Sequence, residues 1–538
     1  MRVQPGLAVV LSLAASAVVG GWLGPRVATA QDPVADRYRV YTAALAAIER
    51  QYVEPVESDQ LVYGSINGML QTLDPHSNFM DPRSYKQMRE RQEGRYFGLG
   101  ITIQAVPDGI TSVRVFEGSP AHAKGIRRGD VIAEIEGQST KGWTSDDAVG
   151  KLRGPKGTFV NIGIRRKGLD QLIPMAVMRD QVSIPSLSAV FMIDDQTGYV
   201  GITDFAERTD EDLGTALESL TRKGKKRLVL DLRGNPGGQL DQAIRISNRF
   251  LPKGAMVVYT RGRVANSDED YRATEDPGYA TLPMITLVNR SSASASEIVS
   301  GALQDHDRAL VIGETTFGKA LVQSVFRVSG GAGLALTTAR YYTPSGRLIQ
   351  RPWDGTFDEY LTYTMKDQSE RAKSPDQLKY TASGRKVYSG GGVDPDERFE
   401  GPTEGFNPTR FGRSLFNRGL FASFAEPYYY ENDTRPGSKS SSFKYVARGF
   451  EVDDAMVAAF RAFVVSRNTV IDEDAWNRDL PFIRAMIRFE IDQAVFDIAT
   501  ARQRLIQADP QAGYALTRFG EAERLLAQSQ GRSGRIGQ

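Results

Sequence analysis

Two apolar segments, each followed by a turn of small residues and a helical pattern, restrict the fold of this chain more than any other feature. Residues 228–233 run into a Gly-Asn-Pro-Gly-Gly turn, and residues 284–289 run into a stretch of serines and alanines. A helix is predicted after each turn. Apolar strands that alternate with helices are typical of a sheet with helices packed on its faces. We therefore expect an α/β layer fold between residues 179 and 400.

The composition indicates a globular protein of several domains. The chain has 538 residues, of which 41% are hydrophobic and 25% are charged, so it can bury several cores. Its 67 basic and 65 acidic residues nearly cancel, and nothing global indicates nucleic acid or an anionic membrane surface as a partner. The absence of cysteine excludes disulfides, cysteine nucleophiles and thiolate metal sites. We predict neither a metal nor an organic cofactor.

The N-terminus has the features of an export signal. Arg2 precedes an apolar stretch over residues 6–23, and a small-x-small pattern follows at residues 28–30. We predict a signal peptide over residues 1–30, with an uncleaved membrane anchor as the alternative, because the apolar stretch is as long as a minimal membrane span. A lipoprotein is excluded because there is no cysteine to acylate. The expected location is periplasmic or otherwise extracytoplasmic.

A helical period continues through the next segment, which we assign to residues 31–90. It is interrupted by a turn signal at Leu73-Asp74-Pro75-His76-Ser77. We interpret His76 as a structural hydrogen-bonding residue, since no second metal-type ligand stands at a usable spacing.

Between residues 91 and 178 the pattern changes to short strands and turns. The segment Phe97-Gly98-Leu99-Gly100-Ile101 opens it, and a capping-box pattern at Thr144 and Asp147 predicts a helix that ends at Arg153. The order of these features resembles a PDZ domain. In that family such a loop presents backbone amides to the C-terminal carboxylate of a peptide, which adds as a strand to a sheet edge. The resemblance implies protein partners with exposed C-terminal tails, and Arg153 is a candidate regulatory contact to the core.

A serine and a lysine are the candidate reactive residues. Ser291-Ser292-Ala293-Ser294-Ala295-Ser296-Glu297 precedes a predicted helix, and Phe317-Gly318-Lys319 follows some twenty residues later. A serine nucleophile needs a base, and the three histidines, at 76, 122 and 306, stand outside any serine-protease motif. A lysine can act as the base when burial lowers its pKa. The competing interpretation is that these serines only cap the helix.

Three blocks in this order, at residues 231–238, 291–297 and 317–323, resemble the C-terminal processing (tail-specific) proteases, which are serine peptidases of the S41 type. The resemblance implies Ser294 as nucleophile, Lys319 as base and Gln323 as the residue that orients the amine. It also implies a core similar to crotonase and Clp-peptidase folds. The chain departs from the family pattern at two places. Ala320 stands where the family usually has a glycine, and Ser291-Ser292 replace a glycine that is frequent there. Both departures affect the local backbone geometry.

Backbone amides near Ser294 are candidate donors to the oxyanion. A serine at a strand-to-helix turn stands at the positive end of the helix dipole, where the N–H of Ala295 can face a developing oxyanion. A second donor is expected from Gly237 or Gly238, and the sequence does not choose between them. Asp305 is either an assisting carboxylate or a structural one.

The chain is therefore predicted to be a multidomain α/β protein in six segments. These are a signal peptide or anchor (1–30), an N-terminal helical segment (31–90), a PDZ domain (91–178), an S41-type catalytic core (179–400), a loop and linker (401–442) and a C-terminal helical domain (443–538). The last segment carries helical periods but no chemical motif, so we interpret it as a packing or self-association element.

The predicted function is that of an exported serine endopeptidase that recognises the C-terminal tails of envelope proteins and cleaves them with a Ser-Lys dyad. A homo-oligomer formed through the N- or C-terminal helices and an envelope adaptor or lipoprotein are the other expected partners. The main alternative is a non-catalytic, PDZ-based scaffold that binds tails. A third hypothesis is acyl-CoA chemistry, which crotonase-type folds also support.

Overall fold

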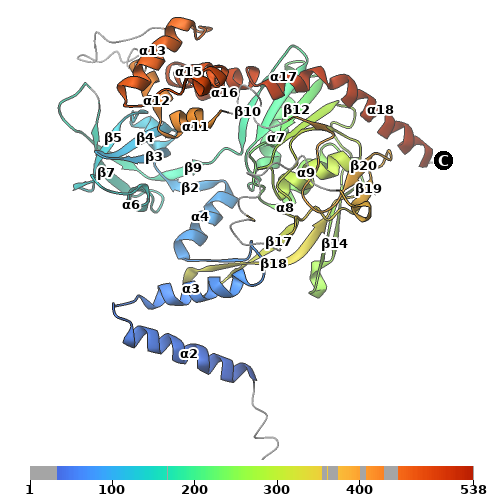
Figure 1. Cartoon of the computed structure of the whole chain (residues 1–538), viewed down its shortest axis with the longest axis horizontal. Helices are drawn as coiled ribbons and strands as arrows, with labels where there is room; N and C mark the ends of the chain where they lie inside the picture. Colours follow the sequence, from blue (N-terminus) through green and yellow to red (C-terminus); the bar gives the residue numbers. More distant parts are fainter. Residues whose placement is uncertain are drawn as a thin grey trace, which may run out of the picture.

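The computed structural model describes residues 33–166, 168–353, 360, 373–399, 408–428 and 446–536. The predicted signal peptide and half of the predicted linker lie outside these ranges. In the described ranges the chain forms N-terminal helices, a small β-domain, a large α/β core and a C-terminal group of helices (Figure 1). None of the helices in these ranges is both long enough and apolar enough to cross a membrane.

The N-terminal segment is helical, as its period predicts. It consists of α2 (Pro33–Gln51), α3 (Ser58–Gln71), the short strand β1 (Asn78–Met80) and α4 (Pro82–Glu93). Helix α4 begins at a proline after Asp81, whose side chain accepts a hydrogen bond from the N–H of Ser84, and it ends at Gly94 in the left-handed conformation. These caps define the length of a helix that later forms one wall of the candidate site.

The β-domain corresponds to the segment that resembles a PDZ domain. Its sheet has the order β3 (Ile101–Val106), β4 (Gly109–Val115), β5 (Val131–Ile135), β7 (Phe159–Arg165) and β8 (Ile173–Met178), with β6 (Gln138–Ser139) paired to β5. The helices α5 (Pro120–Ala123) and α6 (Ser145–Leu152) pack on it. The predicted capping box of Thr144 and Asp147 is confirmed at the start of α6.

The segment that opens this domain contributes to two separate sheets. It divides into β2 (Arg95–Gly98) and β3, and β2 pairs with β9 (Asp180–Ser183) in a separate ribbon. The division occurs at Gly100, which has a φ of +80°. A Cβ there would lie 2.2 Å from the Cβ of Ser119, so only glycine allows this turn.

The core is built on a six-stranded sheet, and the strands predicted at residues 228–233 and 284–289 lie at its centre. Its order is β10 (Leu187–Met192), β11 (Thr197–Ile202), β12 (Arg227–Asp231), β15 (Met284–Val288), β16 (Leu310–Gly313) and β21 (Glu397–Arg398). All pairs are parallel except that between β10 and β11. One face is covered by α7 (Thr209–Arg222), α8 (Leu240–Asn248) and α9 (Ala295–Asp305), which bury a continuous apolar cluster. The predicted α/β layer fold is thus confirmed.

A second sheet joins the N-terminal segment to the core. It contains β14 (Glu269–Arg272), β13 (Met256–Gly262), β18 (Gly333–Tyr342) and β1, in this order, and β17 (Leu321–Arg327) pairs with β18. Strand β1 pairs with β18 in the register Asn78 to Ala335. The turn that precedes β1 is therefore held beside β18, although some 250 residues separate them in the sequence.

The C-terminal helices form two packing units. A helical group with its own apolar core contains α11 (Arg410–Asn417), α12 (Leu420–Ala425), α13 (Asp454–Ser466), α14 (Glu473–Arg478), α15 (Leu480–Val495) and α16 (Ile498–Gln507). The last helices, α17 (Pro510–Thr517) and α18 (Phe519–Ile536), instead cover the second face of the six-stranded sheet, where Ala515 and Phe519 are buried against Val229 and Ile285. The C-terminal extension is therefore partly a layer of the core.

Candidate active site

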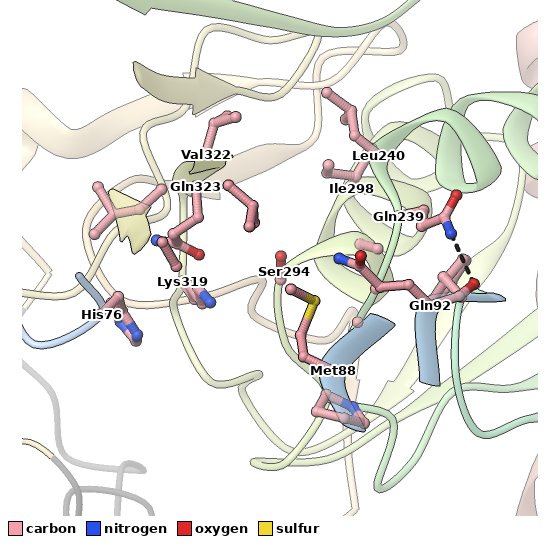
Figure 2. Close-up of a pocket in the computed structure, with 18 of the residues that line it drawn as sticks. His76, Met88, Gln92, Gln239, Leu240, Ser294, Ile298, Lys319, Val322 and Gln323 are labelled. Carbon is pink, nitrogen blue, oxygen red and sulfur yellow. Dashed lines mark hydrogen bonds between the residues drawn. The ribbon is translucent and has the colours of Figure 1, made fainter. Parts of the chain in front are cut away.

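A cavity of about 940 Å³ opens between the core, the second sheet and α4. It is lined by all six core residues of the predicted site, namely Ser294, Lys319, Gln323, Ala295, Gly237 and Gly238. His76 and the α4 residues Met88 and Gln92 also line it (Figure 2). The fold therefore brings three distant blocks of sequence, together with the N-terminal segment, to one cavity.

Ser294 has an unusual backbone conformation at the end of the turn between β15 and α9. Its φ is 55° and its ψ is −113°. A positive φ costs a non-glycine residue of order 1–3 kcal/mol, and such strain is concentrated at functional sites. An ordinary N-cap residue has an extended backbone instead, so helix capping alone does not account for this geometry.

The glycine-rich turn after β12 packs directly against this serine. Gly237 has a φ of +97°, and a Cβ on it would lie 2.8 Å from the Cβ of Ser294 and 2.7 Å from the carbonyl oxygen of Ala293. The N–H of Gly237 donates to the side-chain oxygen of buried Asn235 at 2.9 Å. This hydrogen bond occupies the amide of Gly237, which leaves those of Gly238 and Ala295 as the available candidates beside Ser294.

Lys319 lies largely removed from water on the opposite side of the cavity from α9. Burial lowers the pKa of its ammonium below the ordinary 10.5, although the carboxylates of Glu297 and Asp74 act in the opposite direction. Within the described ranges no hydrogen bond joins its amine to the hydroxyl of Ser294, and Figure 2 shows the two side chains on separate parts of the wall.

Gln323 is hydrogen-bonded to β18, which in turn contacts the N-terminal segment. Its Nε2 donates to the Oγ1 of Thr337 at 3.3 Å. The N–H of Thr337 donates to the Oγ of Ser77 at 3.1 Å, and this hydroxyl donates to Asp74 at 2.7 Å. No hydrogen bond between Gln323 and Lys319 is formed among the described residues, so the orientation of the amine expected from the family is not made in this state.

His76 lies beside Lys319, a proximity that no local pattern in the sequence indicates. Its Nε2 is 2.7 Å from the hydroxyl of Tyr360. Burial, with the positive charge of Lys319 as the next cause, lowers the pKa of His76 to about 3. The imidazole is therefore neutral at physiological pH. Only the pairing of β1 with β18 brings it here.

Glu297 joins the two reactive blocks through their backbones. Its side chain is completely buried. It accepts hydrogen bonds from the N–H of Ser294 at 2.8 Å, from those of Lys319 and Gly318 at 2.9 and 2.6 Å, and from the Oγ1 of Thr316 at 2.5 Å. Burial raises the pKa of this carboxyl to about 7, although all four hydrogen bonds lower it.

Tyr341 also links Ser294 to Lys319, through their backbone carbonyl oxygens. Its buried hydroxyl lies 3.1 Å from the carbonyl oxygen of Ser294 and also contacts that of Lys319, so its one proton is shared between them. Sequence reasoning missed both bridging residues. The position of Glu297 three residues after Ser294, as in a capping box, was the available signal for the first.

The loop predicted to bind a carboxylate runs from the end of β2 to the start of β3. Leu99 is buried in the β-domain core, and Phe97 is 40% exposed. The hydroxyl of Tyr96 interacts with the amides of Gly100 and Ile101.

Among the described residues Arg153 contacts α4, whereas the sequence predicted a contact to the core (residues 179–400). Its guanidinium forms an ion pair with Glu90 and lies 4.4 Å from the ring centroid of Tyr96. Helix α4 in turn reaches the core, since the carbonyl oxygen of Gln92 accepts from the Nε2 of Gln239 at 2.8 Å (Figure 2). Arg153 is thus connected to the cavity through this helix.

Asp305 has a structural partner at the far end of α9. It forms a buried ion pair with Arg347 at 2.5 Å, and it does not line the cavity. Within the described ranges no cluster of three or more histidine or acidic side chains is arranged to hold a metal ion.

Comparison with known proteins matches three parts of the chain to family models. Residues 196–357 match Peptidase family S41, residues 87–165 match the PDZ domain, and residues 27–84 match the N-terminal domain of the activating protease CtpB.

Complete relatives show the same similarity. The carboxy-terminal-processing protease of Bartonella bacilliformis is 40% identical over 307 residues, which cover 56% of this chain and 70% of that protein. The carboxy-terminal processing protease CtpA of Bacillus subtilis is 35% identical over 61% of this chain and 69% of that protein. The solved structure of a photosystem II D1 C-terminal processing protease is 26% identical and covers 67% of this chain and 92% of that one, with a TM-score of 0.34. The identity to the proteins of Bartonella and Bacillus shows that the chain belongs to the carboxy-terminal processing proteases, with an S41 peptidase core and a PDZ domain.

Proposed function

We propose that this protease is an exported serine endopeptidase that cleaves the tails of envelope proteins with Ser294 as nucleophile and Lys319 as base. The observation that carries the proposal is that Ser294 and Lys319 line one cavity and donate their backbone N–H groups to the same buried carboxylate, that of Glu297. A shared acceptor holds the backbones of a nucleophile and its base at a fixed separation.

The proposed mechanism follows from the groups around the cavity. The neutral amine of Lys319 takes the proton of the Ser294 hydroxyl while Oγ attacks the substrate carbonyl. The amides of Ala295 and Gly238 donate to the resulting oxyanion. Lys319 then gives its proton to the leaving amine, and water, activated by the same amine, hydrolyses the acyl-enzyme. Partial burial supports this role of Lys319 because it lowers the pKa of the amine.

The described state is a resting one in this proposal, because Ser294 and Lys319 are not hydrogen-bonded and Gln323 is turned to Thr337. To form the dyad, the amine of Lys319 must come within hydrogen-bond distance of the Ser294 hydroxyl. Binding of a peptide C-terminus is the property that the PDZ domain supplies, and we propose that this binding favours the active arrangement through α4.

The test compares the protein with its Ser294→Ala variant on an unstable protein that carries an apolar tail with a free or an amidated C-terminus. We expect cleavage by the parent alone, weakened by amidation, which would establish both the nucleophile and tail recognition. If neither protein cleaves the substrate while both bind its tail, the non-catalytic scaffold is the better description.

Arg153→Ala is expected to lower the stimulation of cleavage by a free tail by about tenfold, within the usual range of coupling between two sites. The reason is that the variant loses the Arg153–Glu90 ion pair between the PDZ domain and α4. The measurement is the ratio of the rates for free and amidated tails. Arg89→Ala is the matched control, because Arg89 forms an exposed ion pair with Glu93 on the same helix and its loss should leave the ratio unchanged. Equal ratios in the parent and Arg153→Ala would exclude this route.

We also propose a cellular location and an oligomeric assembly for this enzyme. Residues 1–30 carry the export signal, which gives a periplasmic or extracytoplasmic enzyme. Helices α2 and α3 expose several large apolar side chains, among them Tyr38 (67%), Val40 (72%) and Met69 (59%). Exposed apolar surface of this kind favours association, so we propose a homo-oligomer through these helices. An envelope adaptor or lipoprotein is the further proposed partner.

A further inference from the structure

A second cavity, of about 780 Å³, lies between the PDZ domain and the C-terminal helices. Its walls come from β4 and the loop that follows it, from Arg127 and Arg128, from β9, and from the turn between α15 and α16. Figure 1 shows α15 and α16 next to the PDZ domain, and an ion pair between Arg128 and Glu490 of α15 joins them. Among the described residues this cavity shares no lining residue with the one that contains Ser294.

Arg114 of β4 lines this cavity with a positive charge that no carboxylate offsets. Its guanidinium carbon lies 4.9 Å from the ring centroid of Phe116, and among the described residues it forms no ion pair. Burial lowers the pKa of this guanidinium below its ordinary value. Arg502 of α16 is also partly buried, and its pKa is lowered by burial and by the charge of Arg114. The two like charges oppose each other across the interface, so an anion between them would stabilise both.

The carboxylates around the cavity are engaged elsewhere or face water. Asp130 binds Arg166 through two hydrogen bonds of 2.6 and 2.5 Å. Asp497 caps α16, where it accepts hydrogen bonds from the N–H and the Oγ1 of Thr500 at 2.6 and 2.8 Å. Glu117 is exposed to solvent. Arg114 therefore remains available to a negatively charged ligand.

Apolar side chains line two sides of the same cavity. Those of β4 and its loop lie on one side, and those of the α15–α16 turn lie on the other: Val113, Val115 and Phe116, and Ala494, Phe496 and Ile498. A cavity of this size, with apolar walls and a few charged groups, is typical of a site for a small organic ligand. The ligand that fits this lining has a negative group for Arg114 and an apolar body for the walls.

We propose that this cavity binds an anionic amphiphile, with its carboxylate or phosphate group between Arg114 and Arg502 and its apolar chain between β4 and the α15–α16 turn. A fatty acid and a single-chain lipid phosphate both have this chemistry. The bound ligand contacts the PDZ domain, β9 and the C-terminal helices together, so it holds the PDZ domain on those helices. The inference goes beyond the proposed function and does not depend on Ser294.

The first test is calorimetric titration of the whole chain with decanoate and with decyl phosphate, each below its micelle-forming concentration. The Ser294→Ala protein is used, with and without a saturating peptide that has an apolar free C-terminus. We expect binding at one site per chain, with an affinity that the peptide does not change. Binding of both probes supports the shared chemistry, and binding of one identifies the headgroup. Decyl maltoside, with the same chain and an uncharged headgroup, should bind at least about tenfold more weakly.

Variants of the lining separate the two parts of the site. Arg114→Met should weaken decanoate binding by about tenfold or more, because a hydrogen bond to a charged group is lost. Without ligand this variant should unfold at the same temperature as the parent or higher, since the repulsion with Arg502 is gone. Arg165→Met is the matched control, because Arg165 is an exposed arginine of the same domain that does not line the cavity. Ala494→Trp fills the apolar part without a change of charge and should also abolish binding.

Hydrogen exchange locates the bound probe. With decanoate, exchange should slow at residues 113–119 and 493–498. The proposal is overturned if neither probe binds, if Arg114→Met and Ala494→Trp bind as the parent does, or if decyl maltoside binds as tightly as decanoate. Displacement of decanoate by the peptide would place it at the PDZ loop and overturn the proposal as well. All of these results leave cleavage by Ser294 untouched, so they are distinguishable from a failure of the proposed function.

Discussion

Replacing Lys319 by methionine should lower kcat/KM for a tail-bearing substrate by about 10⁴-fold or more, the order seen when the base of a serine triad is removed. Methionine fills a similar volume but cannot take a proton. The folded protein should be as stable as the parent or more so, because the ammonium of Lys319 is held largely out of water, which disfavours its charged form. Cleavage kinetics and thermal unfolding measure the two effects.

The pH dependence of stability gives this variant a second signature. In the folded parent the pKa of Lys319 lies below the 10.5 of an ordinary lysine. Between these two values the unfolded chain binds more protons, so the free energy of unfolding contributed by this group rises with pH. Lys319→Met should lose this rise.

Lys225→Met is the matched control for the lysine prediction. Burial lowers the pKa of Lys225 to about 8, and its amine lies 4.2 Å from the ring centroid of Tyr279. It does not line the cavity. This variant should therefore cleave normally. A Lys319→Met protein that kept more than about a tenth of parental activity would contradict the dyad, since removal of a catalytic base costs far more.

Replacing Glu297 by glutamine should lower kcat by about 10²- to 10³-fold, comparable to the loss of one oxyanion donor. A glutamine side chain has only one acceptor oxygen, and its NH₂ group would face backbone N–H groups that are themselves donors. At least one hydrogen bond to Ser294, Gly318 or Lys319 is therefore lost. The positions of nucleophile and base then relax, and errors of about 1 Å cost rates of this order. KM should change much less than kcat, because Glu297 is completely buried and does not line the cavity.

Glu297 also gives an expected pH profile. Its pKa is raised to about 7 from the ordinary 4.5, and only the ionised carboxylate can accept hydrogen bonds from all four donors. Activity of the parent should therefore fall as the pH drops below about 7, in the same direction as the protonation of Lys319. The folded protein binds more protons than the unfolded chain between the two values, so the contribution of this group to stability falls as pH rises through that window. Glu297→Gln should lose both dependences on this group.

Asp305→Asn separates this positioning effect from a general loss of stability. Asp305 lies in the same helix but pairs with Arg347, away from the cavity. The variant should unfold more easily, since one partner of a buried ion pair is removed, and its folded fraction should keep the parental kcat and pH profile. An Asp305→Asn protein with the same kinetic defect as Glu297→Gln would show that Glu297 acts only through stability.

The sequence alone predicted the kinds of elements and the candidate reactive residues. Largely apolar runs at residues 228–233 and 284–289 predicted the central strands, because a strand buried on both faces is largely apolar. The three blocks that resemble the S41 family, together with the absence of cysteine, led to the prediction of a serine nucleophile and a lysine base. These features are local, so they are readable without the fold.

Only the tertiary structure decided which distant residues share the site. The pairing of β1 with β18 brings His76 to Lys319, and the fold around buried Glu297 joins Ser294 to Lys319. The occupied amide of Gly237 and the ion pair of Arg153 with α4 also depend on packing. Likewise the helical period of α18 predicted a buried face but not the sheet that covers it. The physical reason is that a hydrophobic pattern along the chain predicts how much apolar surface of an element must be buried. Which other element buries that surface depends on the long-range pairing of strands and helices.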